Sequence, residues 1–184
     1  MDLQSWFEKG MGPDEYIESM NTHKENLLHV YDNFTIPPGK TIDDIRDKKI
    51  RIIALTEDWC GDAMLNIPIL LRIAEQLNIE VRFLLRDSNL ELMDQYLTNG
   101  KSRSIQIFTL INQEGQEVAK WGPRAEKIQQ FVEEATDKLP DKTAEDFKEK
   151  QKEVFTFITK SFRDNEQMWN EVYDSLMETI NKIK

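Results

Sequence analysis

The stretch from Ile50 to Ala63 reads IRIIALTEDWCGDA, and it decides the fold. Residues 49–55 are rich in β-branched side chains and predict a short buried strand. From 61 to 77, apolar residues recur at the three-four spacing of a helix. Cys60, the single cysteine of the chain, lies between the two. Because the exposed amides of a first helical turn favour a thiolate, this is a fitting position for a reactive cysteine.

Similar patterns define the elements on either side of this junction. They predict strands over 79–85, 105–111 and 117–121, and helices over 14–31, 88–97 and 125–139. Pro68, inside the 61–77 helix, predicts a bend. Residues 143–184 contain no Gly or Pro and predict two long helices with a break near 163–165. The strands at 105–111 and 117–121 are expected to form a hairpin.

The composition bounds the class of protein. The 184 residues suffice for one domain with an appended element, and a net charge of -10 disfavours nucleic acid and anionic membranes as partners. One cysteine excludes an internal disulfide. The amino terminus lacks the pattern of a signal peptide, and no apolar run approaches the length that spans a bilayer. We therefore expect a cytoplasmic protein.

Motifs for metals and cofactors are lacking. His23 and His29 are six residues apart in a predicted helix, which places them on different faces, so we expect no metal site there. There is no glycine-rich phosphate loop and no Ser-His-Asp context. We expect no bound cofactor.

Three separated motifs follow one another in a familiar order. They are Trp59-Cys60-Gly61-Asp62, Arg86-Asp87 and Trp121-Gly122-Pro123-Arg124. With the order of strands and helices, they make residues 49–139 resemble the thioredoxin superfamily, in particular a bacterial branch that reads Trp-Cys-Gly-Asp-Cys. The resemblance implies an α/β fold, a thioredoxin-like three-layer α/β/α sandwich with a mixed sheet. It divides the chain into an N-terminal helical extension (1–45), a thioredoxin-like domain (46–140) and a C-terminal helical pair (141–184).

The chain departs from the family pattern at three positions. Ala63 replaces the resolving cysteine, so the active-site motif is a degenerate Cys-Gly-Asp-Ala. Gln106 replaces the family's cis-proline, and since a cis bond before another residue costs about 3–4 kcal/mol, we expect a trans peptide there. Ala54 replaces a carboxylate that many thioredoxins bury six residues before the first cysteine. Together these changes remove the dithiol cycle.

Two functions remain compatible with these residues. In the first, Cys60 acts as a monothiol that attacks a protein disulfide or mixed disulfide, and an external low-molecular-weight thiol resolves the product. In the second, the protein is a non-catalytic module that binds a protein partner through the thioredoxin surface. The expected site consists of Cys60 as the catalytic residue and, around it, Trp59, Gly61, Asp62, Ile105, Gln106, Trp121 and Arg124.

Several side chains have a structural alternative. Three acids near the thiol, Glu57, Asp58 and Asp62, oppose a thiolate. Arg124 would either contact a partner's carboxylate or form a salt bridge within the protein. The apolar stripes of the C-terminal helices would form core or, as a third hypothesis, a dimer surface, and the oligomeric state is left open.

Overall fold

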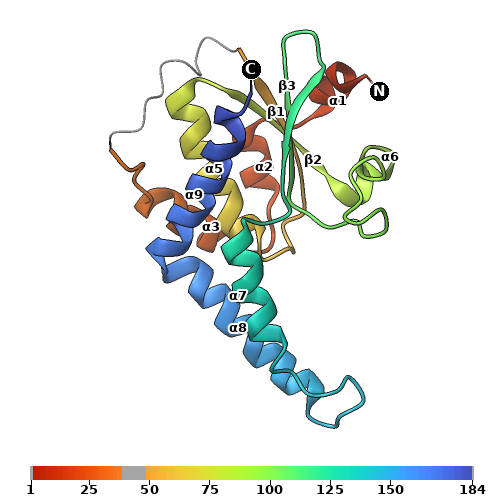
Figure 1. The fold of residues 1–184 in the computed structure, drawn as a ribbon, viewed down its shortest axis with the longest axis vertical. Helices are drawn as coiled ribbons and strands as arrows, with labels where there is room; N and C mark the ends of the chain where they lie inside the picture. The colour runs from red at the N-terminus through yellow and green to blue at the C-terminus, as the bar shows by residue number, and fades with distance from the viewer. Residues whose placement is uncertain (1, 39–48, 184) are drawn as a thin grey trace.

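A four-stranded mixed sheet forms the centre of the computed structural model, which describes residues 2–38 and 49–183 (Figure 1). The strand order is β2-β1-β3-β4. β1 is parallel to β2 and antiparallel to β3, which is antiparallel to β4. The strands are β1 (Arg51–Thr56), β2 (Glu80–Leu85), β3 (Ile107–Ile111) and β4 (Glu117–Trp121). This arrangement confirms the predicted α/β fold class.

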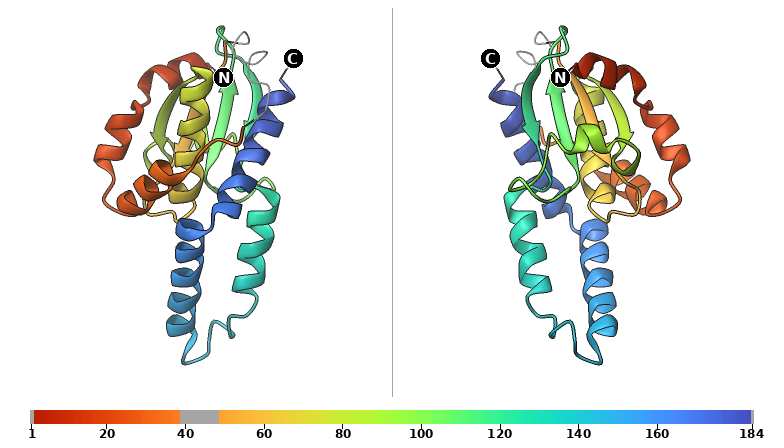
Figure 2. Two further views of the ribbon diagram at one scale, coloured as in Figure 1. Left: turned by 90° about the vertical axis from the view of Figure 1, so that its left-hand side faces the viewer. Right: turned by 90° about the vertical axis from the view of Figure 1, so that its right-hand side faces the viewer.

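Alternation along the strands produces two apolar layers. In β1, Ile52 and Ala54 join one core cluster, whereas Ile53 and Leu55 join the other, because successive side chains point to opposite faces. The first face is covered mainly by α3 (Lys24–Asn33), α5 (Ala63–Leu77) and α9 (Glu166–Asn181). The second is covered by α1 (Leu3–Lys9) and α6 (Leu90–Met93). Figure 2 shows the sheet between these two layers of helices.

The helix predicted over 14–31 is wrong as a single element, because the chain forms α2 (Pro13–Ser19) and α3 with a break between them. Within the break, His23 has a left-handed backbone with φ of 60°. The Asp58 carboxylate accepts hydrogen bonds from the backbone N–H groups of Asn21 (2.6 Å) and Thr22 (3.1 Å). A partner 36 residues away in sequence therefore interrupts the helix and fastens this segment to the loop before Cys60.

The helix predicted over 88–97 is also shorter than expected. The chain forms a 3-10 turn, η1 (Arg86–Ser88), followed by α6. Asn89, rather than Ser88, precedes the helix, and its side-chain amide donates to the Leu85 carbonyl. Beyond α6 the chain turns at Asn99 and Gly100, both of which have positive φ. The predicted domain boundary at 45–46 lies outside the described residues.

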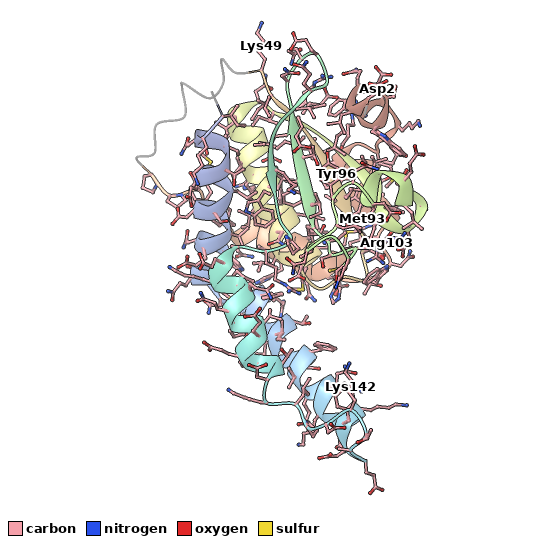
Figure 3. The ribbon with its side chains drawn as sticks, turned by 45° about the vertical axis from the view of Figure 1, so that its right-hand side comes forward. Asp2, Lys49, Met93, Tyr96, Arg103 and Lys142 are labelled. Carbon is pink, nitrogen blue, oxygen red and sulfur yellow. The ribbon has the colours of Figure 1, made fainter. Side chains whose placement is uncertain are left out.

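The C-terminal helices separate into two parts with different surroundings. α7 (Glu126–Thr136) and α8 (Phe147–Asp164) lie side by side and extend beyond the sheet, with Lys142 near the far end (Figures 1 and 3). The break predicted near 163–165 is confirmed at Asn165, whose side chain accepts from the Gln167 N–H and caps α9. The apolar stripe of α9 is buried in the first core cluster, as in the core interpretation.

Replacing Asp58 with Ala should lower the free energy of unfolding by about 1–3 kcal/mol, because two backbone donors lose a charged acceptor. Urea titrations followed by circular dichroism measure this change. Asp58→Asn is the matched control, since it keeps an acceptor oxygen and should lose less. Equal stability of wild type and Asp58→Ala would contradict a stabilising role for the hydrogen bonds from residues 21 and 22 to Asp58.

Candidate functional site

Cys60 lies in a run of turns between β1 and α5. Its backbone N–H donates to the Glu57 carbonyl (3.3 Å), and its carbonyl accepts from the Ala63 N–H (2.9 Å). Glu57 itself is buried and accepts a hydrogen bond from the Asp87 N–H (2.7 Å), which joins this loop to the segment after β2. Burial raises the pKa of the Glu57 carboxyl, partly offset by that hydrogen bond. The Arg86-Asp87 motif thus supports the loop that carries the thiol.

The Cys60 thiol lies in surroundings that favour its protonated form. Its Sγ is 3.7 Å from Asp62 Oδ2 and 4.0 Å from the Ile105 carbonyl oxygen, both acceptors. Burial, and after it the negative charge of Asp62, raise the pKa of Cys60 to about 11 despite the nearby Arg124. At pH 7 the protonated thiol is therefore the predominant form. The position before a helix does not lower the pKa of Cys60 below its ordinary value.

The buried Asp62 and the partly buried Arg124 form a two-point ion pair. Arg124 Nε donates to Asp62 Oδ1 (2.8 Å), and a terminal guanidinium nitrogen lies 2.7 Å from Oδ2. Arg124 Nη1 also donates to Gln129 in α7 (2.8 Å). Burial lowers the pKa of Arg124, but the hydrogen bond and charge of Asp62 more than offset this and raise it overall. Arg124 therefore forms the internal salt bridge, the second of its two alternatives.

The peptide bond between Ile105 and Gln106 is cis, so the expectation of a trans peptide is wrong. The expectation considered only the local free-energy cost of a cis peptide before Gln106. In the folded protein, residues 105–106 are also packed against other parts of the chain. Gly122, with φ of 123°, packs against it so closely that a Cβ would lie 2.0 Å from the Gln106 carbonyl oxygen. Gln106 is fully buried, and neither polar atom of its side chain has a hydrogen-bond partner among the described residues. Its amide is thus placed away from solvent.

The two tryptophans predicted for the site lie in different environments. Trp59 is 49% exposed, and the Arg86 guanidinium lies over its ring, 4.8 Å from the ring centre. Trp121 is buried in the first core cluster, stacks on Phe108 and donates from Nε1 to Ser175 Oγ in α9 (2.8 Å). The predicted site is therefore only partly assembled, because Trp59 lies beside the thiol and Trp121 does not reach the surface.

Two hollows meet at the segment from Trp59 to Asp62, which we call the ridge. The smaller, of about 740 Å³, is bounded by the ridge, residues 103–105 and α7. The larger, of about 850 Å³, lies between the ridge, α3 and α8, and we call it the α8 cleft. Sequence reasoning missed its α8 wall, which includes Lys148, Lys152 and Phe155. Their spacing of four and three residues was the signal that places them on one helix face.

Across residues 2–38 and 49–183, no group of three or more His, Cys, Asp or Glu side chains is arranged to hold a metal ion. His23 lines the α8 cleft, where burial lowers its pKa, while His29 lies 4.0 Å from Asp164. No helix in the described ranges combines the length and apolarity needed to cross a membrane.

The mixed sheet, its two layers of helices and a cysteine between β1 and α5 define a protein of the thioredoxin-fold class. A family model described as thioredoxin matches residues 10–138, and the chain therefore belongs to that family. The match begins at residue 10, so it includes most of the predicted N-terminal extension. A search of curated proteins gives no sequence match.

Two solved structures share this fold over nearly their whole length. One is a crystal structure of an HIV epitope-scaffold, with 11% sequence identity, a TM-score of 0.65, and coverage of 96% of both chains. The other is a protein of unknown function from Pseudomonas aeruginosa, with 13% identity, a TM-score of 0.65, and coverage of 97% of this chain and 98% of that chain. At these identities the likeness extends to the fold alone.

Replacing Gly122 with Ala should lower the free energy of unfolding by more than about 2 kcal/mol, because the new Cβ meets the Gln106 backbone at a strained φ. Gly61→Ala is the matched control, since no atom lies within 4 Å of its added Cβ, and it should change stability little. Urea unfolding compares the two. Similar midpoints for both variants would show that residues 105–106 and 122 are not closely packed.

The alkylation rate of Cys60 by iodoacetamide should rise with pH toward a midpoint near 11. Asp62→Asn should shift that midpoint downward by about one unit or more, because it removes the neighbouring negative charge and releases Arg124. Arg124→Gln should shift it upward. A wild-type midpoint below that of a free cysteine would contradict the protonated thiol described above.

Proposed function

We propose that this protein is a non-catalytic binding module built on the thioredoxin fold, and that it recognises a protein partner through the ridge from Trp59 to Asp62. One observation carries the proposal. A half-exposed tryptophan stands between two hollows, while the thiol next to it is partly buried and protonated. The surface is therefore suited to contact and poorly suited to nucleophilic attack.

The surroundings of Trp59 support recognition of a protein. Tryptophan and arginine are the residue types that most often contribute strongly to binding at interfaces, and here Arg86 holds the Trp59 ring from one side. The smaller hollow has a mixed polar rim, with Arg103 on one side and Glu126 and Glu133 on the other. An exposed aromatic with a polar rim is the usual composition of an interface.

Dithiol chemistry is excluded by the residues themselves. Ala63 occupies the place of a second thiol, is fully buried, and begins α5. The chain contains no other cysteine that could release a mixed disulfide formed at Cys60. Any redox cycle would therefore depend on a thiol from another molecule.

Monothiol activity is the second candidate, and the position of the sulfur favours it. Cys60 Sγ lies beside the Ile105 carbonyl and lines the smaller hollow, so a disulfide bound there would reach it. The Cys60 thiolate would attack one sulfur of that disulfide and expel the other as a thiolate. A low-molecular-weight thiolate would then attack the substrate sulfur of the mixed disulfide, form a disulfide with it and release Cys60 as a thiolate. The attack by Cys60 requires its thiolate, which is the minor form of this residue at pH 7.

The two candidates differ in turnover. Reduction of a low-molecular-weight mixed disulfide is measured at pH 7 with an external thiol in excess, for wild type and for Cys60→Ser. We expect equal rates, because at this pH almost every Cys60 is protonated. A wild-type rate clearly above that of Cys60→Ser would overturn the non-catalytic proposal and support monothiol activity.

The binding surface is tested by partner capture. The resemblance to the bacterial Trp-Cys-Gly-Asp-Cys branch leads us to propose bacterial cytoplasm as the setting, so the immobilised full chain is incubated with such an extract. Cys60→Ser should retain the proteins captured by wild type, whereas Trp59→Ala should lose them. Phe157→Ala is the matched control, because Phe157 is 56% exposed and lines neither hollow beside the ridge. Capture that survives Trp59→Ala would exclude the ridge as the interface.

A further inference from the structure

The α8 cleft has a charge opposite to that of the protein as a whole. The chain carries a formal net charge of -10, yet five basic side chains line the cleft: Lys148, Lys152, Lys160, Arg163 and Arg124. Asp62 is the one acidic residue in the lining, and its carboxylate is already held by Arg124. A cleft lined by one sign of charge concentrates ligands of the other sign.

α8 separates its charges between its faces. Lys148, Lys152 and Lys160 line the cleft, whereas the acids of the same helix, among them Glu149 and Glu153, do not. Lys150, outside the cleft, pairs with Glu153. Over residues 2–38 and 49–183, no carboxylate lies within ion-pair distance of Lys148, Lys152 or Lys160. Their charges are therefore available to a ligand.

The same cleft presents apolar surface next to these lysines. Phe155 is 50% exposed, and Trp59 faces the cleft from the ridge at 49% exposure. Ile158 from α8 and Val132 from α7 also contribute to the lining. Lys148, Lys152 and Phe155 lie on one helix face because they are spaced four and three residues apart. The cleft therefore combines positively charged side chains with apolar surface in one continuous lining.

We propose that the α8 cleft binds an amphipathic organic anion, an apolar chain or ring system that carries one carboxylate or phosphate group. Lys148 and Lys152 hold the anionic group, and Phe155, Ile158 and Trp59 cover the apolar body. The volume of about 850 Å³ falls within the range of sites for small organic ligands. Lys148, Lys152 and Phe155 line the cleft and not the smaller hollow, whereas Trp59 is shared with the ridge.

Isothermal titration of the full chain with dodecanoate at low salt tests this assignment. Dodecanoate should bind one molecule per chain, and added salt should weaken the binding because exposed charges are screened. Dodecyl phosphate is the second arm and distinguishes the head groups. Binding of either anion supports the proposal and identifies the preferred group. Dodecyltrimethylammonium and acetate, which lack the negative charge and the apolar chain respectively, should not bind.

Charge reversal locates the site. Lys148→Glu combined with Lys152→Glu should weaken dodecanoate binding by at least about fivefold, since two attractive contacts become repulsive. Lys142→Glu combined with Lys150→Glu is the matched control, because it makes the same change in net charge and neither residue lines the cleft. Figure 3 shows Lys142 near the far end of the α7–α8 pair. All four lysines are exposed, so both variants should keep the wild-type circular dichroism spectrum. Equal loss of binding in both variants, or equal binding of dodecanoate and dodecyltrimethylammonium, would overturn the proposal.

Discussion

The ion pair between the buried Asp62 and the partly buried Arg124 is the interaction on which the site depends. It joins the start of α5 to the segment after β4, and through Gln129 it reaches α7. Because Asp62 points its carboxylate at Arg124 and at the thiol, the same contact that fixes the ridge also disfavours the thiolate. Breaking such a pair by removing one partner leaves an uncompensated buried charge, which is strongly destabilising. Asp62 therefore contributes both to the structure of the site and, after burial, to the raised pKa of Cys60.

Much of the central fold follows from local patterns in the chain. The β-branched run that became β1 and the apolar spacing that became α5 are long enough to identify without tertiary information. The alternation of Ile52, Ile53, Ala54 and Leu55 between two core clusters follows from the two-residue period of a strand. The position of Cys60 at the end of this unit was therefore predictable.

Features that depend on distant contacts were not predictable in the same way. The helix predicted through residues 20–23 is interrupted where the Asp58 carboxylate, far away in sequence, accepts hydrogen bonds from the backbone of residues 21 and 22. Residues 105–106 pack closely against Gly122, which lies far from them in sequence. The local free-energy cost of a cis peptide does not include this contact. Nearby charges were visible around Cys60, but the burial that contributes most to its pKa was not. α8 lines the cleft because the chain reverses direction after α7 and brings α8 next to the ridge.

The exposure of Trp59 gives the molecule a built-in optical reporter. The chain contains four tryptophans, of which Trp121 and Trp169 are buried and Trp6 is partly buried. Trp59 is the one in contact with both hollows, so its indole emits from an aqueous environment beside them. A neutral collisional quencher such as acrylamide reaches this ring more readily than the other three. A molecule that binds in either hollow shields the Trp59 indole from water and shifts the wavelength of its fluorescence emission. No added label is needed to detect this binding.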